Sequence, residues 1–312
     1  MKKLLLLLCL IAASFENSFS AEKNITELSG PYLGQKPPGM TAEIFAPGFI
    51  STKNHEHSSL IFSKDGKEIY WAVVIGEEQQ IWYTQCNDGK WSKPATIPLS
   101  FAETSGPVLT PDGKYLYFFT NDPNSAADEM PPKRLLWVKD MSDTSWKNIK
   151  LVSNLIPQVN KRATMSFSFS LNGNLYFDLG GPDETGKWDW KIYFSEFKNG
   201  HYSEPVLMDD KINRGKINQN PYISPDESFL IFSSWREGNL GGGDLYISFK
   251  DKNAKWTEPL NMGDRVNTGS QERSASISPD GKYLFFTRHN AETYQDFYWI
   301  DAKIIEELKT KK

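Results

Sequence analysis

The stretch SASISPDGKYLFFTRHN, residues 274–290, has the pattern of two β-strands joined by a tight turn. Asp280-Gly281 separates two runs of apolar, β-branched and aromatic residues, and Asp-Gly between such runs is the strongest short-range signal of a β-hairpin. Glycine tolerates the positive φ that these turns need, and the aspartate side chain can bond nearby backbone amides. Pro279 sets a φ suited to a turn and cannot continue the strand before it.

The same hairpin occurs five times along the chain. Its copies are SSLIFSKDGKEIYWAVV from Ser58, GPVLTPDGKYLYFFT from Gly106, SFSFSLNGNLYFDLG from Ser166, NPYISPDESFLIFSS from Asn220 and SASISPDGKYLFFTR from Ser274. Repetition of this kind indicates a repeat architecture. The turn acid or amide falls at Asp65, Asp112, Asn172, Asp226 and Asp280, and we expect these side chains to shape turns, because catalytic groups normally occur once. Glu227 stands where glycine is expected, which predicts a strained turn or one of another type.

Further strands follow each hairpin. The third strands are IWYTQ at 81, LLWVK at 135, IYFSE at 192, DLYIS at 244 and DFYWI at 296. Four units continue into a weaker fourth strand, namely WSKPATIPL from Trp91, WKNIKLV from Trp146, YSEPVLM from Tyr202 and WTEPLNM from Trp256. Proline in these segments suits an edge strand, where a missing amide donor costs little. Four strands per unit, with no long helical period between them, is the pattern of a β-propeller blade.

The fifth unit lacks its own outer strand, and a candidate lies at the other end of the chain. The segment EIFAPGFIS, 43–51, precedes the first hairpin as the proline-containing segments precede the later ones. We predict that it completes the last blade and closes the ring, which hides edges that an open array would expose. The expected fold is therefore an all-β, five-bladed propeller of four-stranded antiparallel blades over residues 43–301. An extension at 21–42 precedes it, and a short helical tail at 302–312 follows it.

The first twenty residues have the pattern of a secretory signal peptide. Lys2 and Lys3 precede the apolar run LLLLLCLIAA, and Ser18-Phe19-Ser20 supplies small residues before a cut after Ser20. We therefore predict a periplasmic or secreted protein. Lipid anchoring at Cys9 is disfavoured, because Leu8 rather than a small residue precedes it. No other stretch approaches the roughly 20 apolar residues of a membrane helix, so no transmembrane segment is expected.

Charge and cysteine content exclude further classes. Removal of residues 1–20 takes away two lysines and one glutamate, so the net charge moves from −4 to −5. This acidity argues against a nucleic-acid-binding groove, which needs a basic stripe. Cys86 is the one cysteine left, so no internal disulfide can form. Stability must therefore come from the core, to which the 13% of aromatic residues contribute bulky side chains.

The hairpins SPDGKYLFF and TPDGKYLYF, together with GGGDLYIS at 241–248, resemble the PD40 or WD40-like repeats of TolB-type β-propellers. The resemblance extends over about residues 43–301, and YLGQKPPGMTAEIFAPGFIS and DFYWIDAKIIEEL are similar to small exported members with a single propeller. It implies a propeller fold and leaves the chemistry open. It also provides the alternative architecture, a six-bladed TolB-like propeller.

The propeller topology predicts where a site would form. Segments before each first strand and loops after each second strand meet at one face of the central channel, opposite the Asp-Gly turns. Loops on a rigid scaffold and the mouths of closed β structures commonly bind ligands. The predicted ligand-binding residues at this mouth are His55, Glu56, His57, Glu103, Asp122, Arg162, Asn220, Trp235, Arg236, Glu272, Arg273, Arg288 and His289. These groups could equally bind only water and pair glutamate with arginine.

A metal at the mouth is disfavoured on sequence grounds. His55 and His57, two residues apart on a strand, face the same side and could reach one ion with Glu103 as a third ligand. The chain has no second metal-type cluster, and His-Glu-His is not the helical H-E-x-x-H motif. We therefore predict no metal and no cofactor.

Three functions fit the sequence. The leading hypothesis is a non-catalytic module that recognises an anionic glycan or a peptide through Arg162, Arg236, Arg273 and Arg288, with Trp235 as a stacking face. The second is a hydrolase or lyase acting on glycans or lactones, with Glu103 or Glu272 as acid and His57 or His289 as base. The third is a protein-docking scaffold that uses blade edges or the tail. The partner is thus a small ligand, a glycan or a protein.

Overall fold

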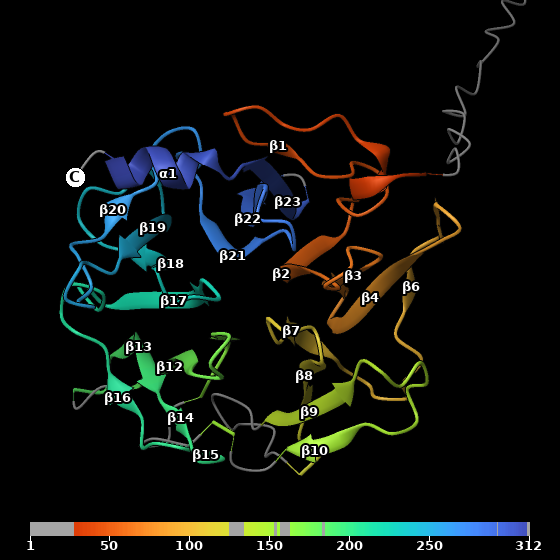
Figure 1. The fold of residues 1–312 in the computed structure, drawn as a ribbon, viewed down its shortest axis with the longest axis horizontal. Coiled ribbons are helices and arrows are strands. Elements are labelled where there is room, and N and C mark those ends of the chain that lie inside the picture. The colour runs from red at the N-terminus through yellow and green to blue at the C-terminus, as the bar shows by residue number, and fades with distance from the viewer. Residues whose placement is uncertain are drawn as a thin grey trace, which may run out of the picture.

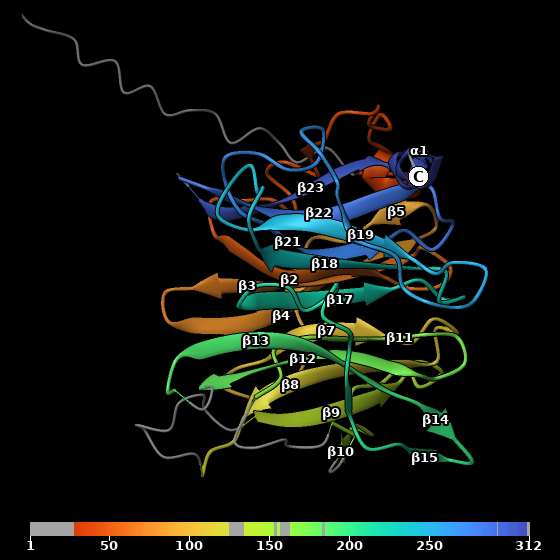
Figure 2. The same cartoon turned by 90° about the vertical axis from the view of Figure 1, so that its left-hand side faces the viewer.

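The computed structural model describes residues 28–124, 134–152, 155–156, 163–182, 185–291 and 293–310. They form five antiparallel blades around a central axis, so the five-bladed propeller is confirmed. Figure 1 looks along this axis, and Figure 2 looks across it at the blades from the side. The signal-peptide prediction and Arg162 lie outside the described residues.

The blades follow one another in chain order. Blade A contains β2 (His55–Phe62), β3 (Glu68–Ile75), β4 (Glu78–Asn87), β5 (Lys90–Trp91) and β6 (Ala95–Thr96). Blade B contains β7 (Ser105–Leu109), β8 (Tyr115–Asn121), β9 (Arg134–Asp140) and β10 (Lys150–Val152). Blade C contains β11 (Phe167–Phe169), β12 (Leu175–Pro182), β13 (Trp188–Ser195) and β16 (Val206–Leu207), with a small hairpin of β14 (Phe197–Lys198) and β15 (His201–Tyr202).

Blade D contains β17 (Ile217–Ile223), β18 (Phe229–Trp235), β19 (Asp244–Phe249) and β20 (Leu260–Asn261). Blade E contains β21 (Glu272–Ile277), β22 (Tyr283–Asn290), β23 (Tyr294–Asp301) and β1 (Glu43–Ile44). Strand β1 pairs antiparallel with β23, with Glu43 opposite Trp299 and Ile44 opposite Tyr298. Closure of the ring by the N-terminal strand is therefore confirmed.

The hairpin turns have the expected chemistry. Gly66 and Gly281 have φ values of 70° and 74°, the left-handed region that glycine enters without a Cβ clash. Asp280 Oδ1 accepts hydrogen bonds from the Lys282 backbone N–H at 3.2 Å and from Ser278 Oγ at 2.8 Å. The repeated aspartates therefore shape turns.

Glu227 adopts the same left-handed conformation without being glycine, with φ 58°, so its turn is strained as predicted. Its carboxylate compensates by joining two blades. It accepts hydrogen bonds from Asn174 at 2.6 Å and Tyr176 at 3.0 Å in blade C, and pairs with Lys250 at 2.6 Å in blade D.

The core consists of five hydrophobic clusters, each between neighbouring blades. The cluster between blades A and E is the most aromatic and contains Phe45, Phe62, Trp71, Phe285 and Trp299. Helix α1 (Lys303–Thr310) extends the cluster between blades D and E by burying Ile304, Ile305 and Leu308. Among the described residues, no helix has the length and apolarity needed to cross a bilayer.

Four of the five innermost strands carry an irregularity near the axis. The residues at this point have positive φ in blades A, B, D and E, namely Ser58, Gly106, Asn220 and Ser274. At the same point the pairing with the second strand shifts register. A bulge of this kind redirects neighbouring side chains, and it sets the direction of His57 and Arg273, which immediately precede it.

Candidate functional site

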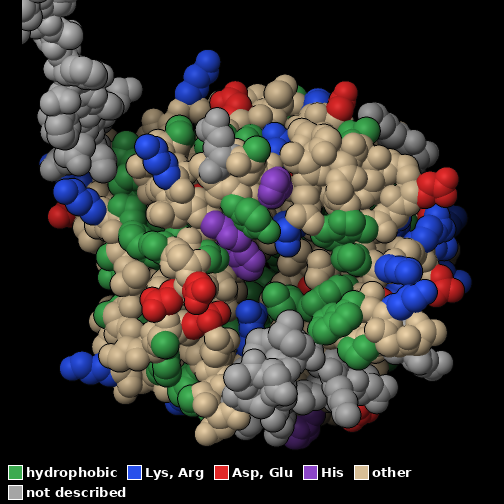
Figure 3. Space-filling model, turned by 180° about the vertical axis from the view of Figure 1, so that it is seen from behind, with side chains coloured by type: hydrophobic (Ala, Val, Ile, Leu, Met, Phe, Trp, Pro, Cys, Tyr) green, Lys and Arg blue, Asp and Glu red, His purple; other side chains and the backbone are tan. Residues whose placement is uncertain are grey.

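A narrow cavity of about 70 Å³ lies on the axis at the predicted mouth. It is lined by the innermost strand of each blade or the residues just before it, with contributions that include His57, Ser105, Ser166, Asn220 and Arg273, and by Arg134 from β9. No Asp or Glu occurs among these lining residues. Figure 3 shows this face, on which histidine and Lys or Arg side chains gather around a central hollow.

His57 is a neutral hydrogen-bonding group in this cavity. Its Nδ1 lies 2.7 Å from Gln79 Nε2 and 3.0 Å from Ser58 Oγ. Gln79 Nε2 can only donate, so Nδ1 accepts and the proton of the neutral ring resides on Nε2. Burial, together with the nearby charges of His55, Arg273 and Arg134, lowers the pKa of His57 to about 3. The ring is therefore uncharged at neutral pH.

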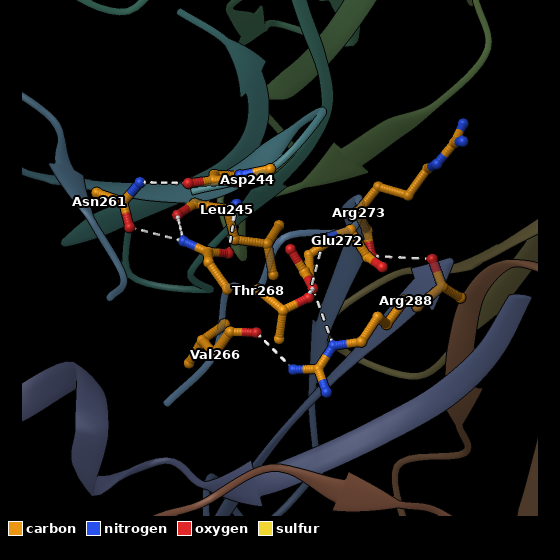
Figure 4. A network of polar contacts seen from close by, with 12 residues as sticks. Asp244, Leu245, Asn261, Val266, Thr268, Glu272, Arg273 and Arg288 are labelled. Carbon is orange, nitrogen blue, oxygen red and sulfur yellow. Dashed lines mark hydrogen bonds and ion pairs between the residues drawn. The ribbon is translucent and has the colours of Figure 1, made fainter. Parts of the chain in front are cut away.

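Arg273 lines the cavity without a carboxylate partner among the described residues. Its Nη2 donates a hydrogen bond to the neutral side chain of Gln271. Burial lowers the pKa of Arg273, which means that the surroundings do not compensate its charge. Figure 4 shows its side chain pointing away from the neighbouring pair of Glu272 and Arg288.

Arg134 is a second arginine of this kind, and the sequence did not indicate it. It is the first residue of β9, opposite Asn121, and its guanidinium lies 5.7 Å from the centre of the Phe119 ring. No carboxylate among the described residues forms an ion pair with it. Burial lowers its pKa, and the nearby carboxylates of Glu103 and Asp178 act in the opposite direction. The prediction had gathered only residues around the two inner strands of each blade, whereas Arg134 reaches the axis from a third strand.

Arg236 is engaged within the protein and does not line the cavity. Its Nη2 donates to the Ile212 carbonyl at 2.8 Å and to Asn218 Oδ1 at 3.0 Å, while the guanidinium stacks 4.7 Å from the Tyr246 ring centre. Arg236 therefore stabilises the loop that connects blades C and D.

Arg288 stabilises the loop that connects blades D and E in the same way. Its Nε pairs with Glu272 Oε1 at 2.9 Å, its Nη2 donates to the Val266 carbonyl at 2.8 Å, and it stacks 4.2 Å from the Tyr298 ring centre. Figure 4 shows this network, in which Thr268 Oγ1 donates to the same Glu272 oxygen at 2.7 Å. Arg162 lies outside the described residues, and of the other three arginines expected at the mouth only Arg273 lines the cavity.

The predicted carboxylates are engaged or buried. Glu56 and Glu272 have no exposed surface, and both lie outside the cavity lining. Glu103 accepts a hydrogen bond from Asn121 at 2.5 Å, and Asp122 accepts one from the Asn124 backbone at 2.9 Å, as a turn residue does.

Asn220 and Trp235 have different positions. Asn220 lines the cavity, and its backbone N–H donates to Asp178 Oδ2 at 3.0 Å. Trp235 packs against Gly243 so closely that a Cβ there would lie 2.6 Å from the indole ring. Its indole is thus packed against the chain at Gly243, and Trp235 lines neither the cavity nor the depression beside His55.

His55 and His289 lie beside the cavity rather than in it. They line a shallow depression of about 510 Å³ at the ends of blades A and E, together with Lys53, Asn54 and Tyr294. His55 and His57 face the same side of β2, as predicted, with ring centroids 5.4 Å apart. Among the described residues, no three His, Cys, Asp or Glu side chains are grouped so that they could hold a metal ion.

Glu56 provides a pH-dependent prediction. Thr52 donates to its Oε1 at 2.7 Å, but Oε2 is buried without a partner, and burial raises the pKa to about 7. When folding raises the pKa of a carboxyl, its contribution to stability is complete at pH values below its pKa in the unfolded chain. This contribution is lost as the pH rises through the pKa in the folded protein, here about 7.

We therefore expect Glu56→Gln to raise the melting temperature at pH 8 by about 3 °C, corresponding to on the order of 2 kcal/mol, and to change it little at pH 5. Melting curves of both proteins at the two pH values test this. An equal shift at pH 5 and pH 8 would contradict the assignment.

A larger cavity of about 1080 Å³ opens at the opposite face, among the Asp-Gly turns. Apolar side chains such as Ile61, Val108 and Tyr222 contribute to its walls. Two lysines at its rim are paired with carboxylates, Lys282 with Asp280 at 3.0 Å and Lys303 with Asp301 at 3.7 Å. Its size exceeds that of the mouth, but the charged residues on its lining carry both signs, as Lys64 and Asp226 do, whereas the charged residues that line the mouth are arginines only. The mouth is therefore the better candidate.

Comparison with known proteins supports the fold. No protein-family model matches the chain, and no curated protein matches it. Solved structures with a similar fold include TolB from Acinetobacter baumannii, at 17% identity and a TM-score of 0.47, over 80% of this chain and 55% of that one. The chain thus spans about half the length of this TolB protein.

Two further structures resemble the chain over most of both lengths. A protein of unknown function from Dyadobacter fermentans has 16% identity and a TM-score of 0.49, covering 85% of this chain and 83% of its own. An endo-arabinase from Bacteroides thetaiotaomicron has 13% identity and a TM-score of 0.53, covering 81% and 96%. At these identities the likeness concerns the fold alone.

Proposed function

We propose that this protein is an exported, non-catalytic receptor that binds the anionic end of a ligand at the mouth of its channel. Arg134 and Arg273 would hold the anion, and His57 Nε2 would donate to it. The observation that carries the proposal is the pair of half-buried guanidinium groups, without carboxylate partners among the described residues, in a cavity whose lining contains no Asp or Glu.

The energetics favour a negatively charged occupant. Burying a charged group without an ion-pair partner is costly. Burial lowers the pKa of both arginines, and at Arg134 the nearby carboxylates of Glu103 and Asp178 offset this only in part. A carboxylate or sulfate between them would restore the pairing with charge-assisted hydrogen bonds, each contributing about 1.5–3 kcal/mol. The cavity of about 70 Å³ admits such a group, but not a whole sugar or amino acid. The rest of the ligand would lie outside it.

The hydrolase hypothesis has less support. Glycoside hydrolysis needs two carboxyl groups facing each other across the substrate, about 5–9.5 Å apart. Glu272 is buried against Arg288, Glu103 is bonded to Asn121, and the cavity lining contains neither. The docking hypothesis is weakened at the tail, because the apolar residues of α1 are already buried.

Calorimetric titration with sodium sulfate and with D-galacturonate tests the proposal. We expect both anions to bind with a Kd of about 1 mM or lower, and neutral D-galactose not to bind. Arg134→Ala and Arg273→Ala should each weaken binding about 10- to 100-fold without loss of the fold.

Arg214→Ala is the matched control, because Arg214 forms an exposed pair with Glu258 at 2.7 Å. It removes the same charge and should leave anion affinity unchanged. Equal binding of galactose and galacturonate, or unchanged affinity in the Arg134 and Arg273 variants, would overturn the proposal.

A further inference from the structure

The ligand body must lie outside the narrow cavity, and the structure offers a place for it. The depression of about 510 Å³ adjoins the mouth on blades A and E. His55 lines the depression and His57 lines the cavity, with ring centroids 5.4 Å apart. Burial lowers the pKa of His55, and the nearby charge of Arg273 adds to this effect. One ligand can therefore occupy both spaces.

Tyr294 is the most unusual residue of this depression. Its side chain is 56% exposed, although it is a large aromatic residue. It has a φ of 71°, a strained conformation for a bulky residue, and it lies between His55 and His289 with ring centroids 4.3 and 5.1 Å away. The packing of the fold does not require an exposed ring in a strained conformation, which is typical of functional positions.

The surroundings of Tyr294 suit a sugar ring. Lys53, Asn54 and Thr293 supply polar groups along the same depression, and Ile75 adds apolar surface with 50% exposure. His55 Nε2 donates to Gln295 at 3.1 Å, so Nδ1 of the neutral ring is an acceptor. Pyranoses combine an apolar C–H face, which packs on an aromatic ring, with closely spaced hydroxyl groups.

A peptide would fit less well. Strand β23, which Tyr294 begins, already pairs with β22 along its whole length, from Tyr283↔Asp301 to Asn290↔Tyr294. Peptides that add to a sheet need a run of unpaired strand edge, and the other edge of β23 is occupied by residues 43–51 at Phe297, Tyr298 and Trp299. The edge of β23 that remains beside Tyr294 is therefore limited to residues 294–296, a short ladder for an added strand.

We infer that the ligand is an acidic oligosaccharide, whose charged end group enters the cavity between Arg134 and Arg273 while the next sugar ring stacks on Tyr294. This inference rests on the proposed anion-binding function and specifies its ligand class. Trp235, the stacking residue expected from the sequence, is replaced in this role by Tyr294.

The test compares monomeric and oligomeric probes by calorimetry. The probes are galacturonate and oligosaccharides of two to four residues derived from polygalacturonate, alginate, hyaluronan and chondroitin sulfate. We expect at least one oligosaccharide to bind about tenfold or more tightly than galacturonate. Tyr294→Ala should abolish this gain and leave the affinity for galacturonate within about twofold, whereas Tyr294→Phe should retain the gain.

Tyr294→Gly separates binding from stability. Glycine adopts a φ of 71° without strain, so this variant should lose the oligosaccharide gain without a lower melting temperature. A purely structural tyrosine would show the opposite, a lower melting temperature with unchanged binding.

The remaining outcomes are distinct. If galacturonate binds through Arg134 and Arg273 but no oligosaccharide binds more tightly, or Tyr294→Ala leaves the tighter binding unchanged, the sugar inference is wrong and the proposed function stands. If an acidic peptide with an aromatic residue shows the Tyr294-dependent gain instead, the ligand class is wrong. If no anion binds, both proposals are wrong.

Discussion

Arg288→Ala should lower the free energy of unfolding by about 3–5 kcal/mol, because it leaves the Glu272 carboxylate buried without its counter-charge. Glu272 has no exposed side-chain surface, and its second oxygen, Oε2, already lacks a hydrogen-bond partner. The same substitution removes the hydrogen bond to the Val266 carbonyl and the stacking on Tyr298. For a propeller of this size, the loss corresponds to a melting temperature lower by about 5–8 °C.

Urea denaturation and calorimetry measure this loss, and two variants control it. Glu272→Gln combined with Arg288→Ala should recover about half of the loss, because a neutral amide replaces the uncompensated charge. Arg214→Ala, which breaks an exposed pair, should cost less than about 1 kcal/mol. A loss below 1 kcal/mol for Arg288→Ala would show that Arg288 is not structural and would return it to the candidate binding residues.

Phe45→Ala should lower the free energy of unfolding by about 3–5 kcal/mol, because Phe45 packs in the hydrophobic cluster between blades A and E. Phe45 is fully buried, its ring centroid lies 5.0 Å from those of both Phe285 and Trp299, and its backbone N–H donates to the Phe297 carbonyl at 2.8 Å. Removal of the ring leaves a cavity in the most aromatic of the five clusters.

The neighbouring residue provides the control for this substitution. Ile44, the last residue of β1, is 37% exposed, so Ile44→Ala should cost less than about 1 kcal/mol. Limited proteolysis adds a local measurement, since Phe45→Ala should expose residues 43–51 to cleavage before the rest of the ring. If both variants melt at the same temperature, the contact between blades A and E does not depend on Phe45.

The sequence predicts this fold well because its signals are local and repeated. Asp-Gly turns such as Asp280-Gly281 restrict the backbone directly, and five copies of one hairpin allow few alternative architectures. The pairing of β1 with β23 was inferable because the last blade lacked a strand and an unused segment of the right type preceded the first hairpin.

The site was predicted less completely, because side-chain direction depends on packing that a linear pattern does not contain. Arg236 follows β18 and Arg273 lies at the start of β21, both at the predicted face, yet Arg236 turns back to the Ile212 carbonyl while Arg273 reaches the channel. Arg134 begins a third strand and reaches the axis over Phe119. The strain at Tyr294 has no sequence signal, since the residue there is not glycine, asparagine or aspartate.

The β1–β23 pairing has a consequence for biosynthesis. Its partners lie about 255 residues apart, so a ribosome that delivers the N-terminus first has made four blades before the partner of β1 exists. Blade E, which carries both Arg273 and Tyr294, is therefore assembled last, from the two extremities of the polypeptide. Only a completely synthesised and closed ring would then bind the ligand, and nascent or C-terminally shortened chains would not bind it.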